Sequence, residues 1–375
     1  MDKIICLNNN YSTTKLCYKL IGNRYLDKFG KIKKEDKFKI NSSKFKIQNS
    51  KVESNNKDKF ETILFLPDGK SRKGEGGLRT RGLFKFSYYK KKDCRWYLCN
   101  SLFEENVILP LANYKYTNLP LITIITVVFN GEKYLEETIQ SIINQTYPNI
   151  EYIIIDGGST DGTIDIIKKY ENYIDYWVSE NDNGIYDAMN KGLKLALGEF
   201  VGILNADDYY EEDAIENLLS LLLNSKKDYA FANVRIIEEN SIIKPIYPLQ
   251  KNKIYQEMLY PHISALIPKK VYKKVGLFNT KFKIAADFDM ALKIHLYGFE
   301  SCYLDKIVAN IHIGGTSDSY KSNYEFMEIA VHNGKSIILA LLTFLKQVIK
   351  LFFVRNLPNI LVKKIQKLKK SRYYG

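Results

Sequence analysis

Cysteine is scarce in this sequence, and the few cysteines form no recognisable framework. The chain has 5 cysteines in 375 residues. This odd number, without the spacing of metal ligands, argues against both a disulfide scaffold and a zinc domain. We interpret Cys94 and Cys99 as ordinary residues rather than as a zinc-binding pair. Because the composition suits a reducing compartment, we expect the protein in the cytoplasm.

Three patterns that would assign a compartment or a function class are also missing. The chain begins with a short apolar stretch at residues 4–7, which is not the pattern of a signal peptide. No Gly-x-Gly-x-x-Gly follows the first predicted strand of the central region, which excludes a dinucleotide-dependent oxidoreductase. Residues 69–82 are basic and glycine-rich but lack the Gly-Lys-Ser/Thr ending of a nucleotide P-loop. A plain hairpin loop is favoured there over a phosphate site.

What the sequence does have is an uneven distribution of charge. Residues 1–118 carry 26 basic and 12 acidic side chains, and residues 333–375 carry 10 basic side chains and no acidic one. The segment between them carries 20 basic and 30 acidic side chains. Two basic arms therefore flank an acidic body. Such arms can bind nucleic acid or an anionic membrane, but acidic loops in the body argue against nucleic acid as a partner.

The carboxyl-terminal arm has the pattern of an amphipathic helix. Large apolar residues recur at helical spacing at positions 338, 341, 342, 345, 348, 349 and 352, and polar side chains lie opposite them at positions 343, 346, 347 and 350. A helix of this kind lies in the plane of a membrane interface. Spanning the bilayer would bury Lys346 and Lys350, at roughly 2.5–3.5 kcal/mol each. We expect contact with the inner face of the membrane; the alternative is a helix whose apolar face packs on the protein.

The middle of the chain alternates apolar strands with amphipathic helices. We predict strands near residues 121–128, 152–155, 175–179 and 199–204, and helices near residues 132–145, 163–170 and 184–197. This alternation predicts an α/β fold with a mainly parallel sheet and helices on both faces. We expect three parts: a basic, partly flexible extension over residues 1–118 with a strand at residues 61–66, a central α/β domain over residues 119–320, and a basic helical arm over residues 321–375.

A polar loop follows each predicted strand of this sheet, at residues 129–131, 156–159, 180–184 and 205–208. In open α/β sheets, ligands bind beyond the carboxyl ends of the strands. Asp207 and Asp208 are the most informative residues of these loops, because adjacent carboxylates repel each other unless a cation lies beside them. A divalent metal that also holds a diphosphate meets this need. The alternative is that both acids cap a helix that begins near residue 210.

Ordered motifs between residues 119 and 315 resemble those of the family 2 glycosyltransferases. They lie at residues 124–132, 144–147, 155–163, 179–192 and 205–208. The resemblance implies an inverting transferase of the GT-A fold that takes a nucleotide-diphosphate sugar as donor and uses Mg²⁺ or Mn²⁺. It further implies a glycan or lipid-linked acceptor, as in the synthesis of bacterial polysaccharides and cell-surface glycans.

The resemblance also implies roles for individual residues. Substrate contacts are implied for the residues that match the nucleotide-binding loops and the acceptor segment, namely Thr126, Phe129, Asn130, Glu132, Asp156, Gly157, Asp182, Lys191, Asn205, Ala206 and His262. The metal is assigned to Asp207 and Asp208. Two positions depart from the family pattern. Gly157 stands where the family often has a base-contacting acid, and Asn205 replaces the first acid of Asp-x-Asp, although an amide can still bond ribose hydroxyls.

The catalytic base is assigned to Asp287, which matches the base position of the family. Displacement with inversion needs a carboxylate to take the proton of the acceptor hydroxyl. The alternatives are that Asp287 caps a helix and that His262 is structural. Two other functions stay open, a catalytically degenerate membrane-associated scaffold and a nucleic-acid-binding protein. Donor hydrolysis in the absence of acceptor would exclude the first, and salt-dependent retention on DNA would favour the second.

Overall fold

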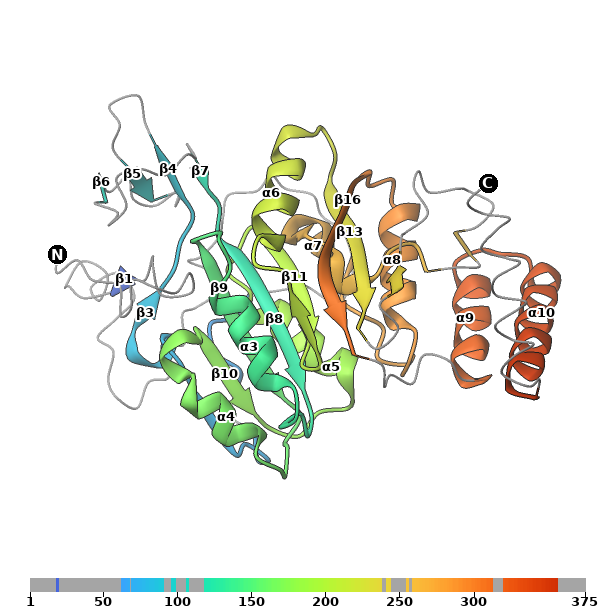
Figure 1. Cartoon of the computed structure of the whole chain (residues 1–375), viewed down its shortest axis with the longest axis horizontal. Coiled ribbons are helices and arrows are strands. Elements are labelled where there is room, and N and C mark those ends of the chain that lie inside the picture. The colour runs from blue at the N-terminus through green and yellow to red at the C-terminus, as the bar shows by residue number, and fades with distance from the viewer. Residues whose placement is uncertain are drawn as a thin grey trace.

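A six-stranded sheet forms the centre of the computed structural model (Figure 1), which describes residues 18–19, 62–67, 69–90, 96–98, 106–107, 118–237, 241–243, 254–255, 258–312 and 320–356. Its strand order is β15-β11-β8-β9-β10-β2. The inner strands are parallel, and they are β11 (Phe200–Asn205), β8 (Ile122–Val128), β9 (Ile150–Asp156) and β10 (Tyr176–Ser179). The edge strands β15 (Ile267–Pro268) and β2 (Gly74–Gly76) run antiparallel to their neighbours. The predicted α/β fold with a mainly parallel sheet is confirmed.

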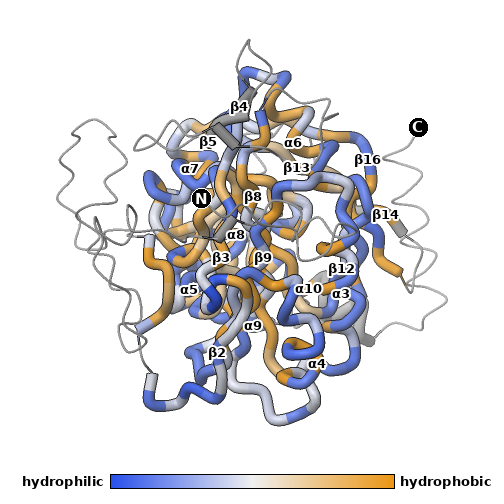
Figure 2. The backbone as a smooth tube through the Cα atoms, turned by 90° about the vertical axis from the view of Figure 1, so that its left-hand side faces the viewer, coloured by the Kyte–Doolittle hydropathy of each residue, from blue (hydrophilic) through white to orange (hydrophobic). Residues whose placement is uncertain are grey.

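Helices cover both faces of this sheet, because the inner strands are apolar on both sides. Every residue of β8 and β9 is buried, as expected for strands between two layers of helices. On one face the core is shared with α3 (Leu135–Ile143), α4 (Thr163–Lys169) and α6 (Ala214–Asn224). On the other face it is shared with α5 (Ile185–Leu195), α7 (Lys269–Val275) and α8 (Ala286–Leu296). Figure 2 shows hydrophobic segments around β8 and β9 at the centre and hydrophilic ones outside.

A second sheet that the sequence did not predict lies beside the first. It has the strand order β12-β16-β13-β14, and its strands are β12 (Asp208–Tyr210), β16 (Ser301–Ile311), β13 (Tyr229–Ile236) and β14 (Ser241–Ile243). β12 occupies the place where a helix was predicted to begin. The next helix, α6, starts at Ala214 and has Asp213 as its N-cap residue. The alternative in which Asp207 and Asp208 cap a helix is therefore wrong.

The glycine-rich segment before the catalytic region joins the central sheet. Residues 69–85, here called the strap, contain β2, a 3-10 turn at Arg79–Arg81 and β3 (Leu83–Phe84). β2 pairs with β10 of the central sheet, so the prediction of a plain hairpin loop is wrong. The strand predicted at residues 61–66 is also wrong, because residues 62–67 are irregular. Leu66 packs into the core on the α5 side of the sheet, which explains the apolar character of this run.

Two buried ion pairs fix the strap to the central sheet. Arg79 Nη2 lies 2.6 Å from Glu151 Oε1, and each side chain is 1% exposed. Lys85 Nζ lies 2.8 Å from Asp175 Oδ2, with side-chain exposures of 0% and 2%. Each cation also donates to a backbone carbonyl, Arg79 to Leu195 O at 2.9 Å and Lys85 to Ile150 O at 2.6 Å. Buried charges are tolerated when they are paired and hydrogen-bonded in this way.

The remaining short strands lie around the strap. β4 (Tyr88–Lys90), β5 (Trp96–Leu98), β6 (Asn106–Val107) and β7 (Asn118–Leu119) form a four-stranded sheet, and β1 (Tyr18–Lys19) pairs with β3. The flexible part of the extension expected near residues 31–59 lies outside the described residues, as do Cys94 and Cys99. The predicted domain boundaries near residues 118 and 320 stay predictions.

Two helices form the carboxyl-terminal arm at one end of the molecule (Figure 1), α9 (Tyr320–His332) and α10 (Ile337–Asn356). α10 packs on α9 through small and aromatic residues such as the buried Ala340. The predicted apolar stripe is exposed, with Ile338 at 66%, Leu342 at 58% and Ile349 at 54%. These three side chains do not pack on the protein, whereas Leu341 lines a cavity against α9; membrane contact of the stripe stays a prediction. No helix in the described residues has the length and apolarity needed to cross a membrane.

Candidate active site

The loops after β8 and β9 are bonded to each other at the carboxyl edge of the sheet. Asn130, at a positive φ of 51°, donates its backbone N–H to Ser159 Oγ at 2.7 Å. Its side-chain Oδ1 accepts a hydrogen bond from Thr160 N at 2.8 Å. The neighbouring Phe129 is 64% exposed. A large aromatic ring left in solvent beside a rigid loop is a surface on which a planar ligand can stack.

Three other predicted substrate residues hold the loops in the structure. Thr126 is fully buried in β8 and accepts a hydrogen bond from a tyrosine hydroxyl of β9 at 3.2 Å. Asp156 is also fully buried, and it accepts hydrogen bonds from two amides of its own loop and from Ser179 Oγ at 2.5 Å. Glu132 Oε2 accepts a hydrogen bond from Gly162 N at 2.6 Å, at the start of α4. Their roles in substrate binding stay predictions.

The loop after β10 brings one free carboxylate oxygen to the rim. Asp182 is half-buried; its Oδ1 accepts a hydrogen bond from Gly184 N at 2.8 Å, and among the described residues its Oδ2 accepts none. Oδ2 lies 2.6 Å from the position that a Cβ atom would take on Gly157. Burial raises the pKa of the Asp182 carboxyl. Lys191, another predicted substrate contact, forms an ion pair in which its Nζ lies 3.0 Å from Glu180 Oε1.

The two acids after β11 differ in their surroundings. Asp207 is exposed, whereas Asp208 is 3% exposed and accepts a hydrogen bond on Oδ2 from Asn205 Nδ2 at 3.1 Å. Burial, reinforced by the negative charge of Asp207, raises the pKa of Asp208 to about 7. The turn between them is held from α3, where Thr138 Oγ1 donates to Ala206 O at 2.9 Å and to Asp208 O at 2.7 Å.

Three buried polar atoms at this edge have no hydrogen-bond partner within the described part of the chain. They are Asn205 Oδ1, Asp208 Oδ1 and His262 Nε2. Unpaired buried polar atoms are rare in folded proteins and call for an explanation. Carboxylate and amide oxygens are ligands that Mg²⁺ and Mn²⁺ accept, so the residues present fit a divalent ion. No group of three or more metal-binding side chains occurs among the described residues; a ligand such as a diphosphate would have to complete the coordination.

Asp287 lies in a small hydrogen-bonded group near the same edge. Its Oδ2 is 3.3 Å from His262 Nδ1, and its Oδ1 accepts hydrogen bonds from Tyr186 Oη at 3.1 Å and from Phe288 N at 2.9 Å. Burial opposes ionisation, but the hydrogen bond and charge of His262 and the other donors outweigh it, so the pKa of Asp287 is lowered. The carboxylate is therefore ionised at neutral pH. Because the N-cap residue of α8 is Ala285, the N-cap alternative for Asp287 is wrong.

Asp289, two residues further along α8, lies in different surroundings. It is 1% exposed, and its Oδ2 is 2.6 Å from Lys293 Nζ. Its Oδ1 accepts a hydrogen bond from Asn333 Nδ2 at 3.0 Å, beyond the end of α9. The carboxylate of Asp289 therefore links α8 to the carboxyl-terminal arm. Its contacts are structural, so a variant at Asp289 can serve as a control for one at Asp287.

The structure adds two side chains that sequence reasoning did not select. Tyr186 lies inside the motif at residues 179–192, and its place in the first turn of α5 was the available signal. His312 follows β16, whose residue Ile311 pairs with Asp208, and its charge lowers the pKa of Asp208 against the larger effect of burial. The His312 ring stacks on the ring of Tyr134, with 4.2 Å between the ring centroids. No local sequence pattern marks His312, because its neighbours at the site come from distant parts of the chain.

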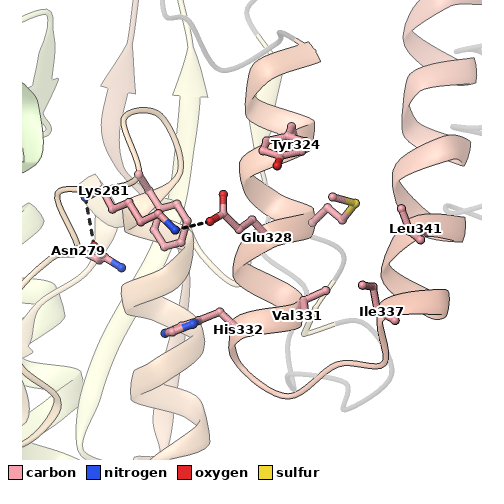
Figure 3. Close-up of a pocket in the computed structure, with 10 residues that line it drawn as sticks. Asn279, Lys281, Tyr324, Glu328, Val331, His332, Ile337 and Leu341 are labelled. Atoms are coloured by element: carbon pink, nitrogen blue, oxygen red, sulfur yellow. Dashed lines mark hydrogen bonds and ion pairs between the residues drawn. The ribbon is translucent and has the colours of Figure 1, made fainter.

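A separate cavity of about 320 Å³ lies where the carboxyl-terminal arm meets the loop before α8 (Figure 3). Its wall combines apolar side chains such as Val331, Ile337 and Leu341 with an ion pair, in which Lys281 Nζ lies 2.6 Å from Glu328 Oε1. None of the candidate catalytic or metal-binding residues lines this cavity. The candidate site at the edge of the sheet is therefore separate from this cavity.

Comparison with known proteins assigns the family. Residues 123–277 match the model of glycosyl transferase family 2. The chain is 32% identical over 228 residues to an uncharacterised glycosyltransferase of Rickettsia typhi, a match that covers 56% of this chain and 70% of that protein. It is also 30% identical over 222 residues to the chondroitin synthase of Pasteurella multocida, but spans only 23% of that synthase.

A solved structure supports the fold. The crystal structure of S. aureus TarS 1-349 in complex with UDP-GlcNAc aligns with a TM-score of 0.50 at 20% identity, over 63% of this chain and 74% of that chain. At this identity the likeness concerns the fold alone, and it agrees with the parallel sheet and the layers of helices described above. The chain is a glycosyltransferase that belongs to family 2 and has the GT-A fold.

Proposed function

We propose that this glycosyltransferase moves a sugar from a nucleotide-diphosphate donor to a hydroxyl of a glycan or lipid-linked acceptor, with inversion at the anomeric carbon. The observation that carries the proposal is the ionised Asp287 carboxylate, held by His262 and Tyr186 near the buried acid of β12. The names of the relatives support the substrate class, since one is a chondroitin synthase and another was solved with UDP-GlcNAc. Synthesis of a polysaccharide or cell-surface glycan follows as the proposed context.

In the proposed reaction Asp287 is the general base. The acceptor oxygen forms a bond to the anomeric carbon while the bond from that carbon to the donor diphosphate breaks. The acceptor proton passes to the Asp287 carboxylate, and the diphosphate carries away the bonding electron pair. Tyr186 and His262 hold Asp287 in place through the contacts at 3.1 and 3.3 Å. A base positioned by two fixed partners needs little reorganisation as the proton moves.

We further propose a divalent Mg²⁺ or Mn²⁺ ion at Asp207 and Asp208. The unpaired Asp208 Oδ1 and the pKa of that carboxyl, raised by burial, support this, because a cation beside a buried carboxylate would stabilise its charged form. Asn205 Oδ1 is a further oxygen at the same place. When bound, the ion would neutralise charge on the leaving diphosphate.

Binding of donors to the full-length protein tests this function. Thermal unfolding should be followed with a panel of nucleotide-diphosphate sugars, with and without Mn²⁺, because a ligand of the native state raises the melting temperature. One donor should stand out, and its effect should need the metal. Asp207→Ala should remove the metal-dependent part, and unchanged affinity in that variant would overturn the metal assignment. If no donor binds or is hydrolysed, the protein is a degenerate scaffold.

We also propose that α10 rests on the anionic inner surface of the cytoplasmic membrane, which would bring a lipid-linked acceptor close. The exposed stripe of Ile338, Leu342 and Ile349 and the 10 basic residues of positions 333–375 support this. Leu342→Glu/Leu345→Glu should abolish sedimentation with vesicles that contain anionic lipid. Tyr297→Glu, a change at an apolar residue 55% exposed on another surface, should leave it intact. Equal binding by all three proteins would contradict the proposal, and retention on DNA would favour nucleic acid.

A further inference from the structure

We propose that Asp182 selects the base of the nucleotide donor, and that it accepts a hydrogen bond from a ring N–H of uracil or guanine. The inference rests on the proposed function, since it names which nucleotide the donor site takes. The Asp182 carboxylate lies against Gly157 of the neighbouring loop, and the strap holds the two loops together.

The Asp182 carboxylate occupies the space that a side chain on Gly157 would take. A Cβ atom at Gly157 would lie 2.6 Å from Asp182 Oδ2, closer than real Cβ contacts allow. Gly157 N donates to Val128 O at 2.8 Å, next to the exposed Phe129. The free oxygen of Asp182 and the Phe129 ring therefore belong to adjoining loops of one edge. A ring to stack on and an acceptor for the edge of a base are what a nucleobase site requires.

The strap holds the Asp182 loop against the loop after β9. Arg72 Nη2 lies 2.8 Å from Glu180 Oε2. Lys73 Nζ donates to Gly158 O at 2.8 Å and to Ser159 O at 3.0 Å, and Lys73 N donates to Ser179 O at 2.8 Å. These contacts tie the ends of β9 and β10 together. The gap between Gly157 and Asp182 is thus fixed before any ligand binds, which lowers the entropy lost on binding.

The order of the strands places Asp182 at the correct end of the site for a base. The proposed metal site follows β11, and β8 and β9 separate β11 from β10. Three steps of about 4.8 Å give a distance of about 14 Å along the edge. An extended nucleoside diphosphate can bridge this distance, with its diphosphate at Asp207 and Asp208 and its base at Phe129 and Asp182.

The Asp182 carboxylate can form a favourable hydrogen bond with only some of the nucleobases. An ionised carboxylate only accepts hydrogen bonds. Uracil presents a ring N–H on its pairing edge, and guanine presents a ring N–H beside an amino group. Cytosine and adenine present a ring nitrogen lone pair at the corresponding position, which repels the carboxylate. A hydrogen bond to a charged group changes affinity by about 10-fold to 100-fold.

Titration calorimetry of the full-length protein with UDP, GDP, CDP and ADP, in the presence of Mn²⁺, tests the assignment. The wild-type protein should bind UDP or GDP at least about 10-fold more tightly than CDP and ADP. Asp182→Asn should lose this preference, because an amide can also donate to a ring nitrogen. Asp187→Asn is the matched control: it removes a carboxylate from the same segment, one that accepts a hydrogen bond from Asn183 N and does not face Gly157. It should keep the preference.

A pair of variants that moves the carboxylate gives an independent test. Gly157→Asp should weaken binding of all four nucleotides, since its Cβ collides with Asp182 Oδ2. Gly157→Asp/Asp182→Ala should restore the preference, because a carboxylate again occupies this place. A preference retained in Asp182→Asn, or a double variant that binds all four nucleotides equally, would overturn the inference while leaving the proposed function intact. A wild-type protein that binds none of the four would overturn both.

Discussion

Two regions of this molecule differ in how their buried charged groups are partnered, the strap edge of the sheet and the carboxyl edge. Where the strap joins the sheet, Arg79 and Lys85 each pair with a buried acid and also donate to a backbone carbonyl. At the carboxyl edge, polar atoms of Asn205, Asp208 and His262 are buried without a partner among the described residues. The two buried cations of the first region are paired with opposite charges, although Arg79 Nε itself has no hydrogen-bond partner among the described residues. The buried acid of the second region, Asp208, forms no ion pair within the described part of the chain.

Paired buried charges stabilise the fold, whereas an unpaired buried acid indicates a site for a ligand. A buried ion pair that is complete stabilises one arrangement of the chain, and breaking it leaves an uncompensated charge. A buried acid without a cation destabilises the free protein and becomes favourable when a ligand supplies the charge. Asp208, whose pKa is raised to about 7, is of the second kind. Variants at the two edges should therefore change different properties.

The largest expected effect is on turnover. Asp287→Asn should lower kcat by about 10²-fold to 10⁴-fold, because the acceptor proton loses its base. Donor affinity, measured by calorimetry, should be nearly unchanged, since the amide keeps the shape of the side chain. Asp289→Asn is the control; it should affect stability more than rate, as Asp289 contacts Lys293 and Asn333. A dead Asp289→Asn enzyme beside an active Asp287→Asn enzyme would move the base to Asp289.

At the strap edge the expected effect is on stability. Lys85→Met should lower the free energy of unfolding by about 3–5 kcal/mol, because Asp175 is left buried without its cation. Urea unfolding measures this change, and Lys85→Met/Asp175→Leu should recover part of it, as replacing both partners with apolar residues removes the unpaired charge. A loss below about 1 kcal/mol in the single variant would show that this pair contributes no more than an exposed one.

At the carboxyl edge, removing a buried charge should raise the free energy of unfolding instead of lowering it. Asp208→Asn should stabilise the metal-free protein at pH 8, by up to about 4 kcal/mol. The folded protein has a raised pKa for Asp208, about 7, against about 3.9 when unfolded. Folding therefore takes up a proton between these values, and the wild type loses stability as pH rises through that window. The advantage of the variant should vanish below about pH 4; urea unfolding curves that keep a constant separation at every pH would contradict it.

The smallest effect is expected at an exposed pair. Lys281 Nζ lies 2.6 Å from Glu328 Oε1, but its side chain is 71% exposed. Lys281→Ala should lower the free energy of unfolding by only about 0.2–1 kcal/mol, and the difference should shrink at high salt. Thermal unfolding at two salt concentrations measures it. A loss above about 2 kcal/mol would mean that Lys281 stabilises the cavity wall through packing rather than charge.

The sequence by itself determined the central strands and the loops that follow them. Continuous apolar, β-branched runs such as Ile122–Val128 are local patterns, and a parallel sheet then places every following loop at one edge. The family motifs at residues 124–132 and 205–208 are also local, and they led to Phe129, Asp207 and Asp208. Asp287 was found in the same way. Each of these inferences needs only neighbours along the chain.

Only the tertiary structure decided how the candidate residues are partnered. The exposure of Asp207 and the burial of Asp208 follow from the pairing of β12 with β16, about 100 residues further along the chain. The contact of Asp287 with Tyr186 and the pairing of β2 with β10 also join segments about 100 residues apart, and Asp287 meets His262 from a separate element. Hydrophobic periodicity carries no information on register between distant strands, nor on which carboxylate loses its water. The sequence therefore predicted a loop for the strap, although the pairing of β2 with β10 makes it part of the sheet and two buried ion pairs anchor it there.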